Sequence, residues 1–168
     1  MNVIRSLGLG LGLALAFALI VAPALAQEIK AGDLTIEKPW ARATPKGAAV
    51  GAAYLEIRNA GTVPDVLIGG SADFAKVQIH EMSMQSGVMT MRELKDGLAI
   101  PADGTLALSP SGYHLMLADL THALTQGQRV TITLTFQRAG AVTIDFPVQP
   151  IGAAGPPQDM KSMDMKGM

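Results

Sequence analysis

The sequence predicts an all-β domain of the sandwich or barrel class, and three observations lead to this fold. Apolar and polar residues alternate over short segments, as they do on half-buried strands. These segments are rich in Val, Ile and Thr, which are stiff in helices and fit a pleated surface. Turn residues such as Asn59-Ala60-Gly61 separate the segments at the spacing typical of sandwiches and barrels.

Roughly nine or ten strands are expected from this pattern. The clearest alternating runs are Tyr54–Arg58, Val66–Ile68, Lys76–His80, Val130–Phe136 and Val142–Phe146, with shorter runs near Leu34, Val88, Leu98, Leu106 and His114. Gln85-Ser86-Gly87 is a turn signal, so residues 76–84 and 88–94 are expected to form a hairpin. The expected core and core-edge aromatic residues are Trp40, Tyr54, Phe74, Phe136 and Phe146.

The first 26 residues differ in kind from the rest. Arg5 supplies a positive start, Leu7 to Val21 is a continuous apolar run, and Ala24-Leu25-Ala26 places small residues at a cleavage site. This pattern is typical of a secretory signal peptide, and an uncleaved membrane anchor is the alternative. We therefore expect residues 1–26 to be removed on export, leaving a chain outside the membrane.

A second change of composition occurs at Pro150. The run Pro-Ile-Gly-Ala-Ala-Gly-Pro-Pro cannot pair in a sheet, so a single domain over residues 27–149 is expected. Residues 150–168 then form a Pro/Gly linker and a methionine-rich tail, expected to be flexible. The tail holds Met160, Met163, Met165 and Met168.

Charge and cysteine content exclude several functions. The formal net charge is −1, and no basic patch indicates a nucleic-acid partner. The chain has no cysteine, which excludes disulfides, thiolate chemistry and a redox CxxC motif. A metal would therefore have to be held by histidine, methionine, carboxylate or backbone groups.

The methionines are clustered around two of the three histidines. Four of the ten methionines lie in residues 80–91, directly after His80. His114 and Met116 share one face of a strand, with Cα atoms about 6.6 Å apart. A hairpin turn at Ser86-Gly87 places Met91 opposite Met82, and a slightly longer loop places it opposite His80. Either register brings Met91 next to His80, and the strand of His114 alongside would complete a cluster of two imidazoles and two thioethers.

The ligand types select the metal. Neutral thioethers favour Cu(I), and imidazole suits copper in both oxidation states. Calcium and magnesium prefer oxygen, zinc sites use Cys, His and carboxylate, and blue-copper centres need a cysteine. The sequence therefore predicts a Cu(I) site, with Ag(I) as an alternative ion, at His80, Met91, His114 and Met116. Met82, Met84 and Met89 are read as packing or a loose outer ring, and His122, which has no methionine nearby, is left out.

These residues resemble the signature of the periplasmic copper chaperones of the PCu(A)C family, in which a histidine is followed by ten residues, a methionine, about twenty-one residues and His-x-Met. Ten residues separate His80 from Met91, and twenty-two separate Met91 from His114-Leu115-Met116, one more than usual. The likeness extends over nearly all of the expected domain, including "PWARATPKGAAVGAAYLEIRN" and "GQRVTITLTFQRAGAVTIDFPV".

The resemblance implies a cupredoxin-like Greek-key sandwich that carries Cu(I) in the periplasm. Since a site without thiolate ligands can release its copper to a stronger ligand set, we expect a monomeric carrier and not an enzyme. The resemblance also implies delivery to the copper-site subunit of cytochrome c oxidase, alongside or through a Sco-like protein. A second copper at the methionine-rich tail is a further expectation, although the tail has no histidine. Three alternatives remain open at this point. They are copper scavenging or storage, a sink for oxidants in which exposed thioethers become sulfoxides, and a catalytic or adhesive domain, for which no nucleophile–base arrangement is visible.

Overall fold

The computed structural model describes residues 28–157, and the expected signal peptide and most of the expected tail lie outside them. Eleven strands and no helix occur in this range, against the nine or ten strands expected. The strands are β1 (Ile29–Ala31), β2 (Leu34–Arg42), β3 (Val50–Asn59), β4 (Asp65–Ser71), β5 (Lys76–Gln85), β6 (Val88–Glu93), β7 (Leu98–Ile100), β8 (Gly104–Leu108), β9 (Tyr113–Ala118), β10 (Arg129–Phe136) and β11 (Gly140–Gln149). The expected all-β fold is confirmed.

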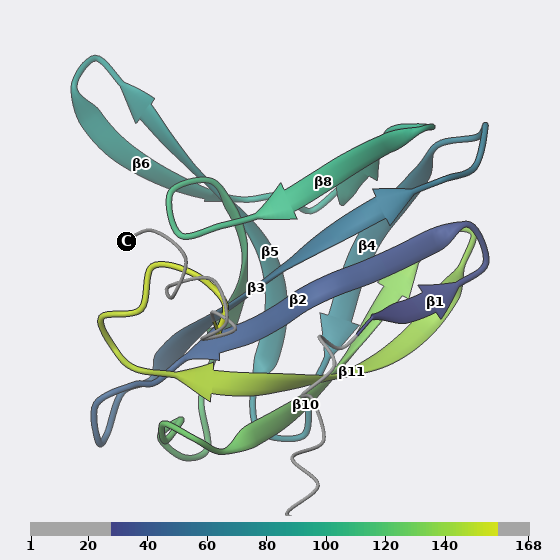
Figure 1. Cartoon of the computed structure of the whole chain (residues 1–168). Coiled ribbons are helices and arrows are strands. Elements are labelled where there is room, and N and C mark those ends of the chain that lie inside the picture. The colour runs from purple at the N-terminus through teal and green to yellow at the C-terminus, as the bar shows by residue number, and fades with distance from the viewer. Residues whose placement is uncertain (1–27, 158–168) are drawn as a thin grey trace, which may run out of the picture.

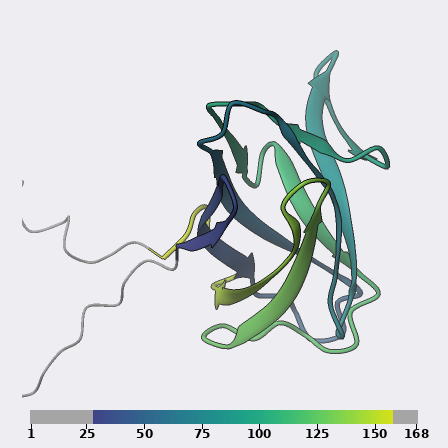
Figure 2. The same cartoon turned by 90° about the vertical axis from the view of Figure 1, so that its right-hand side faces the viewer.

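The strands form one continuous hydrogen-bonded path in the order β6-β5-β9-β3-β2-β11-β10-β4-β7. Strand β1 pairs with β2, and β8 pairs with the second half of β3. The path folds over into two facing layers, because β11 joins β2 only through a short parallel contact at its end (Figures 1 and 2). The layer containing β6, β5, β9 and β3 carries the candidate site.

The core lies between the two layers and is built by alternation along the strands. Leu115 and Leu117 of β9 and Ile132 of β10 are fully buried there, together with Phe136 and Phe146. Burying a side chain of this size stabilises the fold by about 1.5–3 kcal/mol. Since successive strand residues point to opposite faces, the residues between these core positions face away from the core.

The hairpin of β5 and β6 projects beyond the sandwich (Figures 1 and 2). Its turn residues Ser86 and Gly87 have φ values of 51° and 80°, the left-handed values that a two-residue type I′ turn requires. This turn pairs Met82 with Met91. The register is therefore the first of the two that the sequence allowed, and β6 forms an open edge of the sheet.

Candidate metal centre

Two histidines face each other across neighbouring strands on the side of the sheet away from the core. His80 of β5 lies directly opposite His114 of β9. Their ring centroids are 5.8 Å apart, with the ring planes inclined at 49°. Ile79 and Leu115, one position along, point into the core. The alternation of each strand therefore sets both imidazoles on the outer face.

The two remaining predicted ligands flank this histidine pair. Met116 lies opposite Gln78 on one side, and Met91 lies opposite Met82 on the other. Both methionines are thus diagonal neighbours of His80. Diagonal neighbours have Cα atoms about 7–8 Å apart, which long side chains can span. All four residues share one face of the sheet, with the histidine pair in the middle.

The exposed fraction of the side chains increases across these four residues, from His114 to Met91. His114 is 5% exposed, whereas His80 and Met116 are half-buried. Met91, on the projecting hairpin, is 50% exposed. The arrangement is a surface site with a buried inner side and an open outer side.

The imidazole nitrogens are prepared to act as ligands. Both Nδ1 and Nε2 of His80 are buried and have no hydrogen-bond partner among residues 28–157. His114 Nδ1 lies 3.3 Å from the carbonyl oxygen of Gly112, which can only accept, so Nδ1 is the protonated nitrogen and Nε2 keeps its lone pair. Burial lowers the pKa of His114, as does the neighbouring His80, while the Gly112 carbonyl works in the opposite direction. A lowered pKa favours the neutral imidazole, which is the form that binds metals.

His114 also belongs to a row of four rings that crosses four neighbouring strands. Trp40 of β2 lies 4.4 Å from Tyr54 of β3, measured between ring centroids. Tyr54 lies 6.5 Å from His114, and His114 is followed by His80. Trp40 and Tyr54 are each 3% exposed but lie outside the main core cluster. They are buried, as expected, and lie beside His114 on the side away from His80.

The guanidinium of Arg42 lies over the rings of Trp40 and Tyr54. Its guanidinium carbon lies 5.9 Å from the Trp40 ring centroid and 5.6 Å from that of Tyr54, within the range of cation–π attraction. Arg42 Nη2 donates a 2.7 Å hydrogen bond to the carbonyl oxygen of Ala153, in the segment after the last strand. Burial raises the pKa of Tyr54, although the charge of Arg42 opposes the shift, so the phenol stays neutral.

Sequence reasoning missed three neighbours of the site. Tyr54 was read only as packing, although it alternates with the polar Glu56, a sign of the outer face. Gln78 Nε2 donates a 3.2 Å hydrogen bond to Glu93 Oε1, and Glu93 lies opposite His80. This pair places a carboxylate at the edge of the site, and only the hairpin register reveals it.

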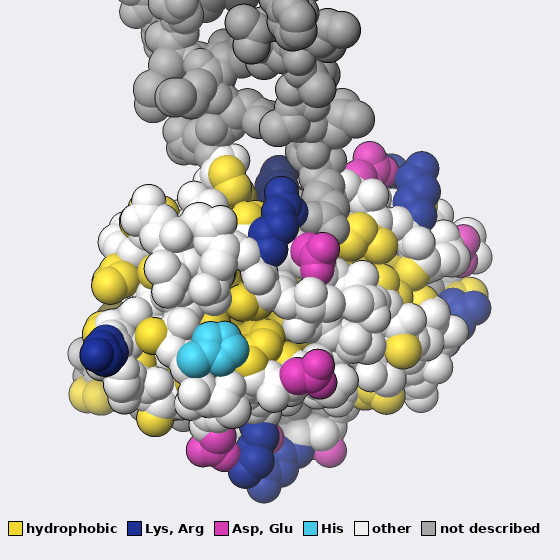
Figure 3. Space-filling view, turned by 90° about the horizontal axis from the view of Figure 1, so that it is seen from below, with side chains coloured by type: hydrophobic (Ala, Val, Ile, Leu, Met, Phe, Trp, Pro, Cys, Tyr) yellow, Lys and Arg dark blue, Asp and Glu magenta, His cyan; other side chains and the backbone are white. Residues whose placement is uncertain are grey.

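The third histidine lies elsewhere. His122 is exposed, its Nδ1 is 3.0 Å from Thr121 Oγ1, and its ring lies 5.9 Å from that of Phe74. Figure 3 shows the lower end of the sandwich, where a histidine lies among hydrophobic side chains. Within residues 28–157, no three His, Asp or Glu side chains gather as a metal-binding group. The outer face of β5 and β9 instead combines two imidazoles with thioethers.

Comparison with known families settles the ancestry of the chain. The profile of the family described as "LpqE-like: Putative lipoprotein LpqE-like" matches residues 34–148. The chain belongs to this family. A relative from Leifsonia xyli subsp. xyli, "Putative lipoprotein Lxx21020", is 33% identical over 135 residues, which are 79% of this chain and 80% of the relative. No helix within residues 28–157 is long and apolar enough to cross a membrane.

Solved PCuAC domains share the fold. The copper-bound PCuAC domain from PmoF2 is 33% identical, with a TM-score of 0.62, covering 74% of this chain and 98% of that domain. The apo PCuAC domain from PmoF1 is 28% identical, with a TM-score of 0.63, covering 74% and 99%. The Cu(I) form of DR1885 from Deinococcus radiodurans is 28% identical, with a TM-score of 0.55, covering 75% and 83%. The expected PCuAC membership and cupredoxin-like fold are confirmed.

Proposed function

We propose that this PCuAC chain is a copper chaperone that binds one Cu(I) ion through His80, Met91, His114 and Met116. The observation that carries the proposal is the pair of facing imidazoles, with the nitrogens of His80 buried and unpaired within the described residues. A thioether flanks this pair on each side. Two neutral nitrogens and two soft sulfurs match Cu(I) better than any hard cation.

The similar proteins support the choice of copper. The PmoF2 domain is described as copper-bound, and DR1885 as its Cu(I) form. The carboxylate of Glu93 lies opposite His80 and puts a negative charge at the edge of the site, which favours a bound cation. Tyr54 and Trp40 shield the inner side from water, which strengthens interactions between the ion and its ligands.

The proposed role is transfer and not catalysis. A site without thiolate ligands can release Cu(I) to a partner with a stronger ligand set, and the exposed Met91 gives that partner access. We propose as recipients the copper-site subunit of cytochrome c oxidase or a Sco-like protein in the periplasm. The export pattern of residues 1–26 and the lipoprotein descriptions of the family and its relative support a location outside the cytoplasm.

The test is a competition between the full chain and a chromogenic Cu(I) chelator under anaerobic conditions. Replacing a residue that only hydrogen-bonds to a metal ligand already weakens metal binding by up to about 100-fold. Replacing two ligands, Met91 and Met116, together by leucine should therefore weaken the tightest Cu(I) site by more than about 100-fold. The substitution roughly conserves volume, so far-UV circular dichroism should stay unchanged.

The matched control is Met84→Leu with Met89→Leu, which removes two thioethers from the hairpin without touching the four proposed ligands. This control should leave the tightest Cu(I) site within about threefold of the wild type, a difference below 1 kcal/mol. An unchanged affinity in the Met91→Leu, Met116→Leu variant would reject the assignment.

A further inference from the structure

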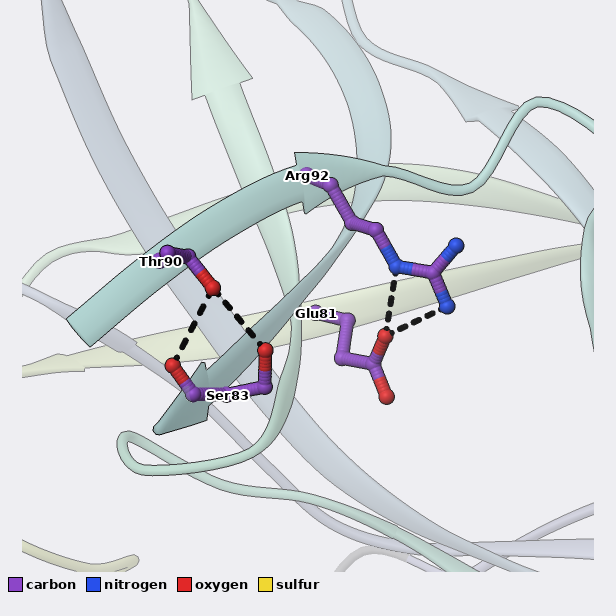
Figure 4. A network of polar contacts seen from close by, with 4 residues as sticks. All are labelled: Glu81, Ser83, Thr90 and Arg92. Carbon is purple, nitrogen blue, oxygen red and sulfur yellow. Dashed lines mark hydrogen bonds and ion pairs between the residues drawn. The ribbon is translucent and has the colours of Figure 1, made fainter. Parts of the chain in front are cut away.

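The projecting hairpin has two unlike faces. On one face, Arg92 forms an ion pair with Glu81, with nitrogen–oxygen distances of 2.7 and 2.8 Å. Ser83 Oγ and Thr90 Oγ1 lie 3.0 Å apart on the same face (Figure 4). Together with the turn at its tip, these polar pairs hold the two strands in register. The opposite face is therefore not needed for polar cross-strand bonding.

That opposite face carries only thioethers beyond His80. Met82 lies opposite Met91, and Met84 lies opposite Met89. We call these four residues the thioether ladder. Alternation places the ladder on the same face as His80, so it continues the candidate metal centre outward along the hairpin.

Ordinary packing does not account for the ladder. Methionine fills irregular gaps in cores, but Met84 and Met89 are 63% and 49% exposed and lie outside the core cluster. All six residues of β6 are exposed, and β6 is an edge strand. Met84 and Met89, two apolar side chains kept in solvent at the end of a strand pair, need a role other than burial, whereas Met82 is half-buried between them and the inner centre.

We propose that Met84 and Met89, together with Met82, form a second, outer binding site for a soft monovalent metal ion. Directly opposite side chains have Cβ atoms about 4.5–5.5 Å apart, and the next residue on the same face follows after about 6.6 Å. Flexible thioethers at this spacing can converge on one ion. Sulfur ligands of this type select Cu(I) and similar soft ions.

The outer site binds more weakly than the inner one, because it offers no imidazole and is open to water. Its innermost member, Met82, lies between Met84 and His80 on β5 and opposite Met91. An ion captured at the hairpin tip can therefore pass inward from sulfur to sulfur toward the imidazoles. This relay rests on the proposed function, whereas the outer site itself does not.

The experiment is a titration of the full chain, labelled with carbon-13 at the methionine methyl groups, with Ag(I) as a soft monovalent probe that does not change oxidation state. Methyl resonances are assigned by single Met→Leu variants. The Met91 and Met116 methyls should shift over the first equivalent. The Met84 and Met89 methyls should shift in a later, separate step, at about tenfold higher free Ag(I), which corresponds to 1.4 kcal/mol.

Two double variants locate the second step. Met84→Leu with Met89→Leu should abolish the later shift of the Met82 methyl and leave the Met116 shift unchanged. The control, Met163→Leu with Met165→Leu, should leave every hairpin shift in place.

The proposal is overturned if the Met84 and Met89 methyls stay fixed while Met116 responds, because the ladder is then only an apolar surface. It is equally overturned if they respond in parallel with the tail methyls of Met163 and Met165, which would show unselective thioether affinity. A response of Met84 and Met89 with Met116 unmoved upholds the outer site and instead contradicts the proposed function.

Discussion

Asp65 and His80 both have shielded polar atoms, but only Asp65 has hydrogen-bond partners for them among the described residues. Asp65, at the start of β4, is 4% exposed, and its carboxylate accepts hydrogen bonds from three backbone N–H groups. These come from Val66 at 2.7 Å, Arg138 at 2.8 Å and Ala139 at 3.0 Å. His80, at the candidate centre, has two buried nitrogens with no partner among the described residues.

The difference separates a structural polar group from one reserved for a ligand. Buried polar atoms are almost always hydrogen-bonded, because leaving one unpaired costs about 1–3 kcal/mol. Asp65 satisfies this rule and ties the β10–β11 turn to β4. His80 violates it beside thioethers and a second imidazole. The two groups lie on different strands, β4 and β5, and substitutions can therefore test the structural and the ligand-binding role separately.

The largest expected effect on stability is that of Asp65→Ala. The change leaves three backbone N–H groups without their acceptor, and we expect it to lower the free energy of unfolding by about 3 kcal/mol. Urea denaturation measures the loss. Asp145→Ala is the control, since Asp145 accepts only an exposed hydrogen bond from Thr131, and a loss of similar size there would remove the contrast.

The same carboxylate should make the free energy of unfolding depend on pH in the acidic range. Burial alone would raise the pKa of Asp65, but the backbone hydrogen bonds and the charge of Arg138 outweigh it, so the pKa lies below the ordinary 3.8. As the pH falls below that value, the unfolded chain takes up the proton first, and stability that is present at higher pH is lost. The free energy of unfolding, measured by denaturation at several acidic pH values, should decrease more steeply with falling pH in the wild type than in Asp65→Asn. Parallel curves would show that Asp65 is not the responsible group.

His80→Leu, unlike Asp65→Ala, should stabilise the metal-free chain. Removing two unpaired buried nitrogens is expected to raise the free energy of unfolding of the metal-free chain by about 1 kcal/mol. Thermal and urea unfolding measure this gain, and the chelator competition should show that the tightest Cu(I) site is lost. A clear destabilisation of the metal-free chain would mean that His80 is a structural residue like Asp65.

The smallest effect is expected at the polar face of the hairpin. Arg92 is 69% exposed in its ion pair with Glu81, so Arg92→Ala should change stability by no more than about 1 kcal/mol. It should leave the tightest Cu(I) affinity unchanged, because this face points away from the imidazoles. A large loss of affinity, measured by the same competition, would show that the hairpin face matters for the inner site.

Much of the fold and the arrangement within each strand could be predicted from the sequence. Alternation in Tyr54–Arg58 or Val130–Phe136 is a local signal, and it places strands and faces correctly. The Ser86-Gly87 turn signal limited the hairpin to two registers, and the structure adopts the one that pairs Met82 with Met91. The common face of His114 and Met116 follows from the same period of two.

The contacts between distant strands could not be predicted in this way. The pairing of β5 with β9, which sets His80 against His114, depends on how the whole sheet closes. No residue type indicates that the Gly112 carbonyl accepts from His114, or that Tyr54 and Trp40 line up behind it. The sequence therefore predicts the ligand types better than their surroundings.

X-ray absorption at the copper edge tests the central claim most directly, using the full chain loaded with one equivalent of Cu(I). We expect a mixed ligand shell in which imidazole nitrogens and thioether sulfurs both scatter. Replacing His114 by alanine should weaken the imidazole contribution and leave sulfur in place. A shell of sulfur alone, or one without sulfur, would contradict a centre built from His80, Met91, His114 and Met116.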